Sequence, residues 1–236
     1  LENGLPVLAY DERDLDAGAE GDRDFWAAAA RETSGPVLEL GCGGGRLLSV
    51  AHAASRADRA LIGIDLDRDA LALASERLPN AALIAADARS WRAVPLERAG
   101  LVIIGGDLIP LILEPGDLCS LFSTAAYHLA EGGIVGIDAT RMDARLLAAA
   151  AAAPRWGVDI ERSDQVQGLD GAARVDGESG ASALERAATM VRRESRIEPD
   201  PAGRTAVAAL PIRHRDVGAP ISAAHTRAPF AIRAWS

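Results

Sequence analysis

The sequence predicts an α/β fold, with a doubly wound, mostly parallel sheet and an accessory region that contains an antiparallel hairpin. Three observations support this prediction. Short apolar runs of strand length alternate with segments of helical periodicity from residue 37 to residue 138, a pattern typical of parallel sheets with crossover helices. The first of these runs ends in a glycine-rich turn. Further along, the turn sequence Asp200-Pro201-Ala202-Gly203 separates two more runs, as in a hairpin.

The composition excludes several classes of protein. The 236 residues suffice for one substantial domain, or for one domain with a lid. The net charge of -9 argues against a nucleic-acid partner, which would require a basic face. The two cysteines cannot form a disulfide framework or a metal-ligand pair, so we expect no metal site. Because we find neither a signal peptide nor a membrane-spanning run, we expect a cytoplasmic protein without a membrane partner.

Residues 1–34 are expected to form an N-terminal cap and a helix. The first 24 residues are acidic and have no clear period. They are either a surface arm or a cap that folds over a ligand, and Tyr10 is the candidate contact in the second case. A helix is predicted over Phe25–Arg31 and ends before Pro36. We expect Phe25 and Trp26 to pack in the core.

The segment Val37–Leu48 predicts a buried strand, a tight turn and the start of a helix. Glu39 lies within the strand, and glycines follow at positions 41, 43, 44 and 45. Glycine permits the positive φ angles and the close backbone approach that such a turn needs. The dinucleotide fingerprint Gly-x-Gly-x-x-Gly requires a glycine where Arg46 stands. The Glu39 carboxylate would repel a pyrophosphate and suits a ligand that carries an amino group and a sulfonium.

The next two strands run into aspartates. The second strand is predicted over Leu61–Ile64 and ends in Asp65. An acid at that place accepts hydrogen bonds from both ribose hydroxyls, and NAD enzymes use it in the same way. The third strand is predicted over residues 81–86 and leads into Asp87. Asp87 is either the cap of the following helix or a contact for a nucleobase.

With these acids, the acid-x-Gly-x-Gly-x-Gly pattern resembles the first motif of the class I S-adenosylmethionine-dependent methyltransferases, which have a Rossmann-like fold. The resemblance extends from residue 37 to residue 138. It implies S-adenosyl-L-methionine as the cofactor, with its methionine end at the glycine turn and its adenine at Asp87 and the backbone N–H that follows. The candidate cofactor-binding residues are Tyr10, Glu39, Gly41, Cys42, Gly43, Gly45, Asp65, Leu66, Asp87, Ala88 and Gly105.

The fourth strand, predicted over residues 100–104, leads into Gly105-Gly106-Asp107. In the family this turn lines the gap between the sulfonium methyl and the acceptor, so Asp107 is the first candidate for a general base. The motif Asn/Asp-Pro-Pro-Tyr/Phe is missing here, which disfavours DNA bases and Gln side chains as acceptors. A helix over residues 117–130 is expected to stop at Glu131-Gly132-Gly133, and the fifth strand to follow over residues 134–138.

Residues 141–236 are expected to form the accessory hairpin region and the end of the sheet, within one compact domain that has its cofactor-binding core at 35–140. A helix is predicted over 142–153, a strand over 158–162, and a hairpin from 190–197 and 205–215. The hairpin carries His214, the second candidate for a general base. Residues 229–235 are expected to supply a sixth strand, and we find no seventh. The resemblance implies that this region forms the acceptor pocket or a homodimer contact.

The predicted function is transfer of a methyl group from S-adenosyl-L-methionine to the N or O of a small-molecule acceptor. The protein aligns the nucleophile with the methyl group and excludes water. A general base is needed only if the acceptor arrives protonated, and a metal-assisted mechanism stays open. The alternatives are a cofactor-binding protein without catalysis and an NAD(P)-dependent oxidoreductase, which Arg46, Glu39 and Asp87 disfavour.

Overall fold

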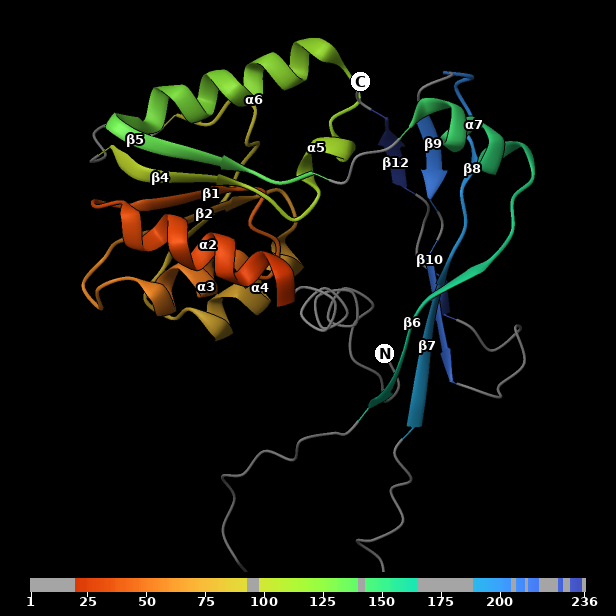
Figure 1. Cartoon of the computed structure of the whole chain (residues 1–236), viewed down its shortest axis with the longest axis horizontal. Coiled ribbons are helices and arrows are strands. Elements are labelled where there is room, and N and C mark those ends of the chain that lie inside the picture. Colours follow the sequence, from red (N-terminus) through yellow and green to blue (C-terminus); the bar gives the residue numbers. More distant parts are fainter. Residues whose placement is uncertain are drawn as a thin grey trace, which may run out of the picture.

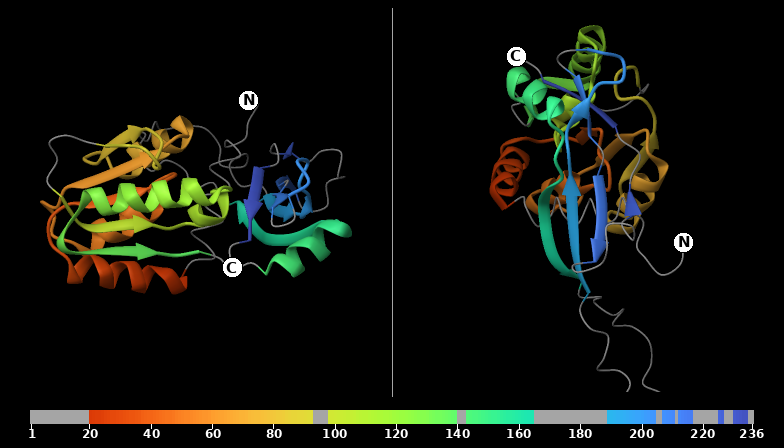
Figure 2. Two further views of the ribbon diagram at one scale, coloured as in Figure 1. Left: turned by 90° about the horizontal axis from the view of Figure 1, so that it is seen from above. Right: turned by 90° about the vertical axis from the view of Figure 1, so that its right-hand side faces the viewer.

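The computed structural model describes residues 20–92, 98–139, 143–164, 189–204, 207–210, 212–216, 225–226 and 230–234, with the backbone alone at 20–21, 157–164, 189–193, 212–216, 225–226 and 230–231. The elements of the main lobe are α2 (Glu20–Glu32), β1 (Val37–Leu40), α3 (Arg46–Ala54), β2 (Leu61–Asp65), α4 (Arg68–Arg77), β3 (Ala82–Ala85), β4 (Ala99–Ile104), α5 (Leu108–Leu111), α6 (Pro115–His128) and β5 (Leu129–Ile137). The accessory lobe contains α7 (Ala144–Ala152), β6 (Gly157–Asp164), β7 (Thr189–Ser195), β8 (Glu198–Pro199), β9 (Val207–Leu210), β10 (Ile212–Asp216), β11 (His225–Thr226) and β12 (Phe230–Arg233). Figures 1 and 2 show the two lobes side by side.

The main lobe is built on a parallel sheet with the strand order β3-β2-β1-β4-β5. The predicted α/β fold with a doubly wound sheet is therefore confirmed. The chain runs outward from β1 to β3 and then returns to place β4 on the other side of β1. Ligands of such sheets bind beyond the carboxyl ends of the strands, at the point where the strand order reverses. Here that point lies between β1 and β4. The carboxyl end of β5, the strand next to β4, points toward the accessory lobe (Figure 1).

Helices cover both faces of the parallel sheet. Alternate strand residues point to opposite faces, so Val37 and Leu101 belong to one core layer and Leu38 and Val102 to the other. The first layer packs under α2 and α3, and the second under α5 and α6. Figure 1 shows α2 and α6 on opposite sides of the strands. This two-sided burial explains why the strands are continuous apolar runs rather than alternating ones.

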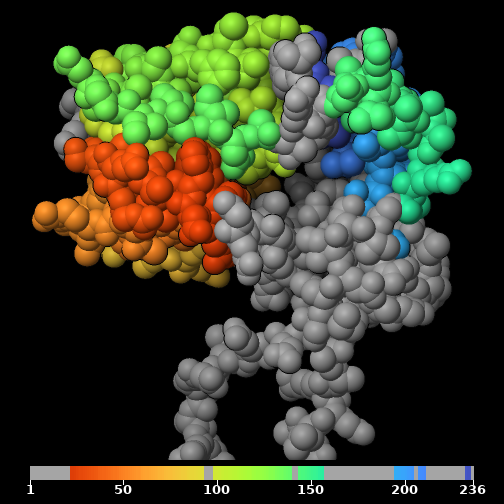
Figure 3. Space-filling view, in the orientation of Figure 1, coloured from red at the N-terminus to blue at the C-terminus, as the bar shows by residue number. Residues whose placement is uncertain are grey.

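Trp26 fixes α2 on the sheet. Its side chain is fully buried, and its Nε1 donates a hydrogen bond to Asp138 Oδ2 at 3.3 Å. The ring lies directly over Gly136 of β5, where an added Cβ would come within 2.4 Å of it. Figure 3 shows α2 and β5 against one another on the surface. The predicted core position of Trp26 is confirmed, whereas Phe25 is 53% exposed because it lies on the outer side of the helix.

The accessory lobe contains two antiparallel sheets, with the strand orders β11-β10-β7-β6 and β12-β9-β8. The predicted hairpin is present, because β7 pairs with β10 and β8 pairs with β9. Each of its two arms contributes one strand to each sheet, and we did not predict this separation into two sheets. Gly203 closes the turn with a φ of 73° and donates its N–H to Asp200 O at 2.9 Å. Strand β9 ends immediately before Pro211, which lacks the N–H that a strand ladder needs.

Two expectations about the sheet are wrong. Strand β12 does not extend the parallel sheet, because it pairs antiparallel with β9. Its Ile232 packs with Leu147 of α7 in a separate apolar core of the accessory lobe. Strand β5 begins at Leu129, so Gly132 lies inside the strand, where its φ of 73° accompanies a register shift against β4. Within the described residues, no helix has the length and hydropathy that crossing a membrane requires.

Candidate functional site

A cavity of about 590 Å³ lies at the carboxyl ends of the parallel strands. Its volume is within the range of small-molecule sites, roughly 300–1,000 Å³. The lining residues that follow β1, β2, β3 and β4 are Gly41, Gly43, Asp65, Leu66, Ala86, Asp87, Ala88, Arg89, Gly106 and Leu108. The remaining lining residues come from the α5–α6 segment and from the accessory lobe, and they are Leu111, Ile112, Leu113, Glu114, Asp117 and Arg204.

The glycine turn after β1 has the backbone conformation that the sequence predicts. Gly41, Gly43 and Gly45 have φ angles of 76°, 50° and 76°, which L side chains rarely adopt. Gly41 donates its N–H to Ile64 O of β2 at 2.7 Å. A Cβ on Gly41 would lie 2.8 Å from Leu108 Cδ2. Glycine at position 41 thus lets the turns after β1 and β4 approach each other at the mouth of the cavity.

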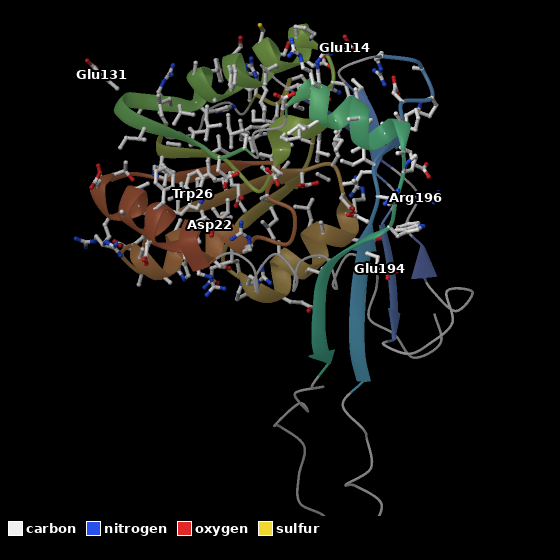
Figure 4. The ribbon with its side chains drawn as sticks, turned by 45° about the vertical axis from the view of Figure 1, so that its right-hand side comes forward. Asp22, Trp26, Glu114, Glu131, Glu194 and Arg196 are labelled. Atoms are coloured by element: carbon white, nitrogen blue, oxygen red, sulfur yellow. The ribbon has the colours of Figure 1, made fainter. Side chains whose placement is uncertain are left out.

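Two charged residues brace the helix that follows this turn. Glu39 is 2% exposed, and its Oε2 accepts the N–H of Leu48 in α3 at 2.9 Å. Arg46 stands where the dinucleotide fingerprint has its third glycine, and it forms two hydrogen bonds with Asp22 of α2, at 3.0 and 2.8 Å. Figure 4 shows Asp22 and Trp26 on α2, beside the sheet. Both charged side chains therefore hold α3 in place behind the cavity.

Asp65 presents its carboxylate to the cavity and also holds the glycine turn. Its Oδ2 accepts the N–H of Gly43 at 2.7 Å, and its Oδ1 accepts the N–H of Asp67 at 2.8 Å. An ionised carboxylate offers about four acceptor positions. The two backbone bonds fix the direction of the carboxylate and leave room for hydroxyl donors from the cavity.

Asp87 lies on the same wall, after β3. Both of its oxygens accept hydrogen bonds from the Arg89 side chain, at 2.6–3.1 Å. These hydrogen bonds lower the pKa of the Asp87 carboxyl below its usual value, against a smaller opposing effect of burial. Asp87 therefore stays ionised, and it meets a ligand as a hydrogen-bond acceptor. The neighbouring Ala88 also lines the cavity.

Several predicted cofactor residues lie behind the cavity wall. Glu39, Cys42, Gly45 and Gly105 are not among its lining residues. Cys42 is buried against Gly63, and Gly45 packs against Ala74. A Cβ on Gly105 would lie 2.3 Å from Leu47 Cδ1, so its small size serves packing, whereas the next residue, Gly106, faces the cavity. Tyr10 lies outside the described residues.

The described residues show no contact between the two candidate bases, Asp107 and His214. Asp107 has a left-handed φ of 61° and an exposed side chain, and its N–H donates to Asp138 Oδ1 at 3.4 Å. Its chain neighbours Gly106 and Leu108 line the cavity. Burial raises the pKa of the Asp138 carboxyl. The backbone of His214 lies in β10, and its side chain lies outside the described residues.

Arg204 is the residue of the accessory lobe that lines the cavity within the described residues, and it was not predicted from the sequence. Its Nε bonds Asp200 Oδ2 at 2.8 Å, and its Nη1 bonds Glu114 Oε1 at 3.3 Å. Hydrogen bonds from Arg204 lower the pKa of Asp200 to about 2. A second contact between the lobes runs from the Arg233 guanidinium to the Leu113 carbonyl oxygen. Glu114 faces the accessory lobe in Figure 4.

Comparisons with known proteins gave a family match and several similar solved structures. Residues 37–133 match the family described as "Methyltransferase domain". No curated protein sequence matches the chain. Among solved structures, the chain is similar to DesVI of Streptomyces venezuelae, with 19% sequence identity, a TM-score of 0.63, and coverage of 98% of this chain and 86% of that chain.

Two further structures are similar to the chain at comparable levels. One is CalS10 from Micromonospora echinaspora, described as an S-adenosylmethionine-bound amino pentose methyltransferase, with 17% identity, a TM-score of 0.62, and coverage of 100% of this chain and 86% of that chain. The other is the sugar N-methyltransferase KedS8 from a Streptoalloteichus species, with 16% identity, a TM-score of 0.65, and coverage of 100% of this chain and 82% of that chain. At these identities the likeness shows the fold.

The family match covers β1 to β5 and thus every strand end around the cavity. Residues 37–133 match the methyltransferase domain family, and the chain has the Rossmann-like fold of the similar solved structures.

Proposed function

We propose that the chain transfers a methyl group from S-adenosyl-L-methionine to a nitrogen or oxygen of a small molecule. One observation carries the proposal: a cavity at the reversal of strand order has Asp65 and Asp87 on its wall, beside the glycine turn. CalS10 is an amino pentose methyltransferase and KedS8 is a sugar N-methyltransferase. They support a small acceptor for this chain too.

The residues present fit the cofactor. We assign the ribose hydroxyls to Asp65 and the adenine amino group to Asp87, with the backbone N–H of Ala88 for a ring nitrogen. Both carboxylates are held in fixed directions by neighbouring donors. Gly41 and Gly43 form the backbone surface for the methionine end. The buried Glu39, Gly45 and Gly105 support this surface from behind.

The bound cofactor supplies a methyl group that is already activated by its sulfonium. The chain's contribution is to orient the acceptor and to exclude water. Apolar side chains of the α5–α6 segment face the cavity, at Leu108, Leu111, Ile112 and Leu113. For an acceptor that arrives protonated, Asp107 is the proposed base and His214 the second candidate.

We also propose a division of the chain that follows its apolar cores. Residues 35–140 form the cofactor-binding core, with one apolar layer on each face of the sheet. Residues 141–236 form the accessory region, whose described part has an apolar core of its own. Residues 1–34 add α2, whose Trp26 and Ala30 complete one of these two layers, and, in this proposal, a cap over the cofactor.

Turnover on defined acceptors tests the proposed function. Purified protein with S-adenosyl-L-methionine is offered an amino sugar, a hydroxyl-bearing sugar, a single-stranded oligonucleotide and a glutamine-containing peptide, and release of S-adenosylhomocysteine is measured. We expect release with a sugar acceptor, and loss of that release in Asp65→Ala. Release of S-adenosylhomocysteine with the oligonucleotide or the peptide, and with neither sugar, would contradict a small-molecule acceptor. Binding of the cofactor without release on any acceptor would favour a protein that binds the cofactor without catalysis.

A further inference from the structure

Three cavity residues form a continuous chain of ion pairs. Arg89 lies between two carboxylates, Asp87 at the end of β3 and Asp117 in the first turn of α6. Its Nη2 is 2.6 Å from Asp87 Oδ2, and its Nη1 is 2.5 Å from Asp117 Oδ2. Its Nε adds bonds to both Asp87 oxygens, at 2.9 and 3.1 Å. All three residues line the cavity.

This arrangement fixes the Asp87 carboxylate from two sides. A guanidinium is planar and rigid, so its fork holds a carboxylate in one plane, which a lysine ammonium cannot do. The other end of the fork is anchored on α6 through Asp117. The backbone of the same turn is also tied to α6, because Thr124 Oγ1 donates to Arg89 O at 2.9 Å. The direction of Asp87 is therefore set both within the turn, where the Arg89 N–H donates to Asp87 Oδ1 at 2.9 Å, and by the link of the Arg89 side chain to α6.

A carboxylate held in this way distinguishes between hydrogen-bonding partners. Being ionised, Asp87 can accept a hydrogen bond but cannot donate one. A nucleobase with an exocyclic amino group supplies the matching donor. A base with a carbonyl at the same place brings two acceptors together and leaves both without a donor, which is costly in a partly buried site.

We propose that Arg89 is a positioning residue that makes Asp87 selective for a base with an exocyclic amino group over a base with a carbonyl. The inference rests on the proposed function, because it assumes that the cofactor's base lies at Asp87. In this arrangement Arg89 does not contact the reacting atoms. It acts through the carboxylate that it orients, and Asp117 holds it in place.

Calorimetric titration with two ligands tests this role. The ligands are S-adenosylhomocysteine and S-inosylhomocysteine, in which a carbonyl replaces the amino group of the base. We expect the wild type to prefer the adenosine form by about 100-fold, which corresponds to about 2.8 kcal/mol and lies within the cost of leaving a hydrogen-bonding group unpaired. Arg89→Ala is expected to reduce this preference to less than about tenfold, because Asp87 is then held, among the described residues, only by the backbone N–H of residue 89, which donates to its Oδ1 at 2.9 Å. Arg89→Lys should lose most of the preference too, and Asp117→Asn part of it.

Arg92→Ala is the matched control. Arg92 belongs to the same turn and also reaches α6, through Thr124 Oγ1 at 2.6 Å, but it donates its other hydrogen bond to Trp91 O and not to Asp87. It should keep the wild-type preference. An unchanged preference in Arg89→Ala, even with weaker binding of both ligands, would show that Arg89 is merely structural. A full preference in Arg89→Lys would show that charge alone suffices. Failure of the wild type to bind either ligand would instead overturn the proposed function.

Discussion

Replacing Asp65 with alanine is expected to weaken the binding of S-adenosylhomocysteine by about a thousandfold. Hydrogen bonds to charged groups contribute roughly 1.5–3 kcal/mol each, and the two ribose hydroxyls would lose two of them. Since each 1.4 kcal/mol corresponds to about tenfold in affinity, the loss of about 4 kcal/mol gives this factor. The change also removes the acceptors of the Gly43 and Asp67 N–H groups, which shape the glycine turn. Calorimetric titration measures the effect directly.

Asp67→Ala is the control for this experiment. Asp67 lies two residues away and caps α4, accepting the N–H groups of Asp69 and Ala70 at 2.9 and 3.2 Å. It does not line the cavity. Its loss should lower the free energy of unfolding by about 1 kcal/mol, as for other helix caps, and leave affinity within about threefold of wild type. If Asp65→Ala binds within tenfold of wild type, the ribose does not lie at Asp65.

Replacing Trp26 with alanine is expected to lower the free energy of unfolding by about 4 kcal/mol. Large-to-small changes of buried aromatic residues typically cost about 3–5 kcal/mol, because the cavity that is left collapses only in part. Trp26 is fully buried over Gly136, which has no side chain to fill the space. The change also leaves the half-buried Asp138 without its indole donor. Urea denaturation followed by circular dichroism measures the loss.

Phe25→Ala tests whether burial, rather than aromatic content, accounts for this effect. Phe25 is the adjacent residue of the same helix, its ring is in edge contact with Trp26, and it is 53% exposed. Its replacement should cost less than about 1.5 kcal/mol. Similar losses in the two variants would contradict the packing of α2 described here.

The local features of the main lobe could be predicted from the sequence because the chain encodes them in short stretches. The turn at Gly41 requires positive φ angles, and only glycine adopts them freely. Asp65 and Asp87 follow apolar runs directly, so the parallel arrangement of the strands brings them to one edge of the sheet. Their presence on one cavity wall therefore followed from periodicity and from the parallel fold.

Other features depend on tertiary packing, and no short pattern indicates them. Arg204 directly follows the predicted turn that ends at Gly203, and nothing near it in the sequence shows that it reaches Glu114. Residues 230–233 have the apolar character of a strand, but that character does not indicate which sheet a strand joins. Glu39 matches the first motif of the family and Gly105 was a further candidate cofactor residue, and the structure places both behind the wall rather than on it. A sequence motif does not distinguish a residue that contacts the ligand from a residue that supports such a contact from behind.

The most direct test of the cofactor assignment is calorimetric titration of the wild type with S-adenosylhomocysteine, NAD and NADP in parallel. We expect binding in the micromolar range for S-adenosylhomocysteine and none for the two nicotinamide cofactors. Arg46 stands where the dinucleotide fingerprint has its third glycine, and the Glu39 carboxylate would repel a pyrophosphate. Binding of NAD or NADP in place of S-adenosylhomocysteine would contradict the account, beginning with the glycine turn at Gly41.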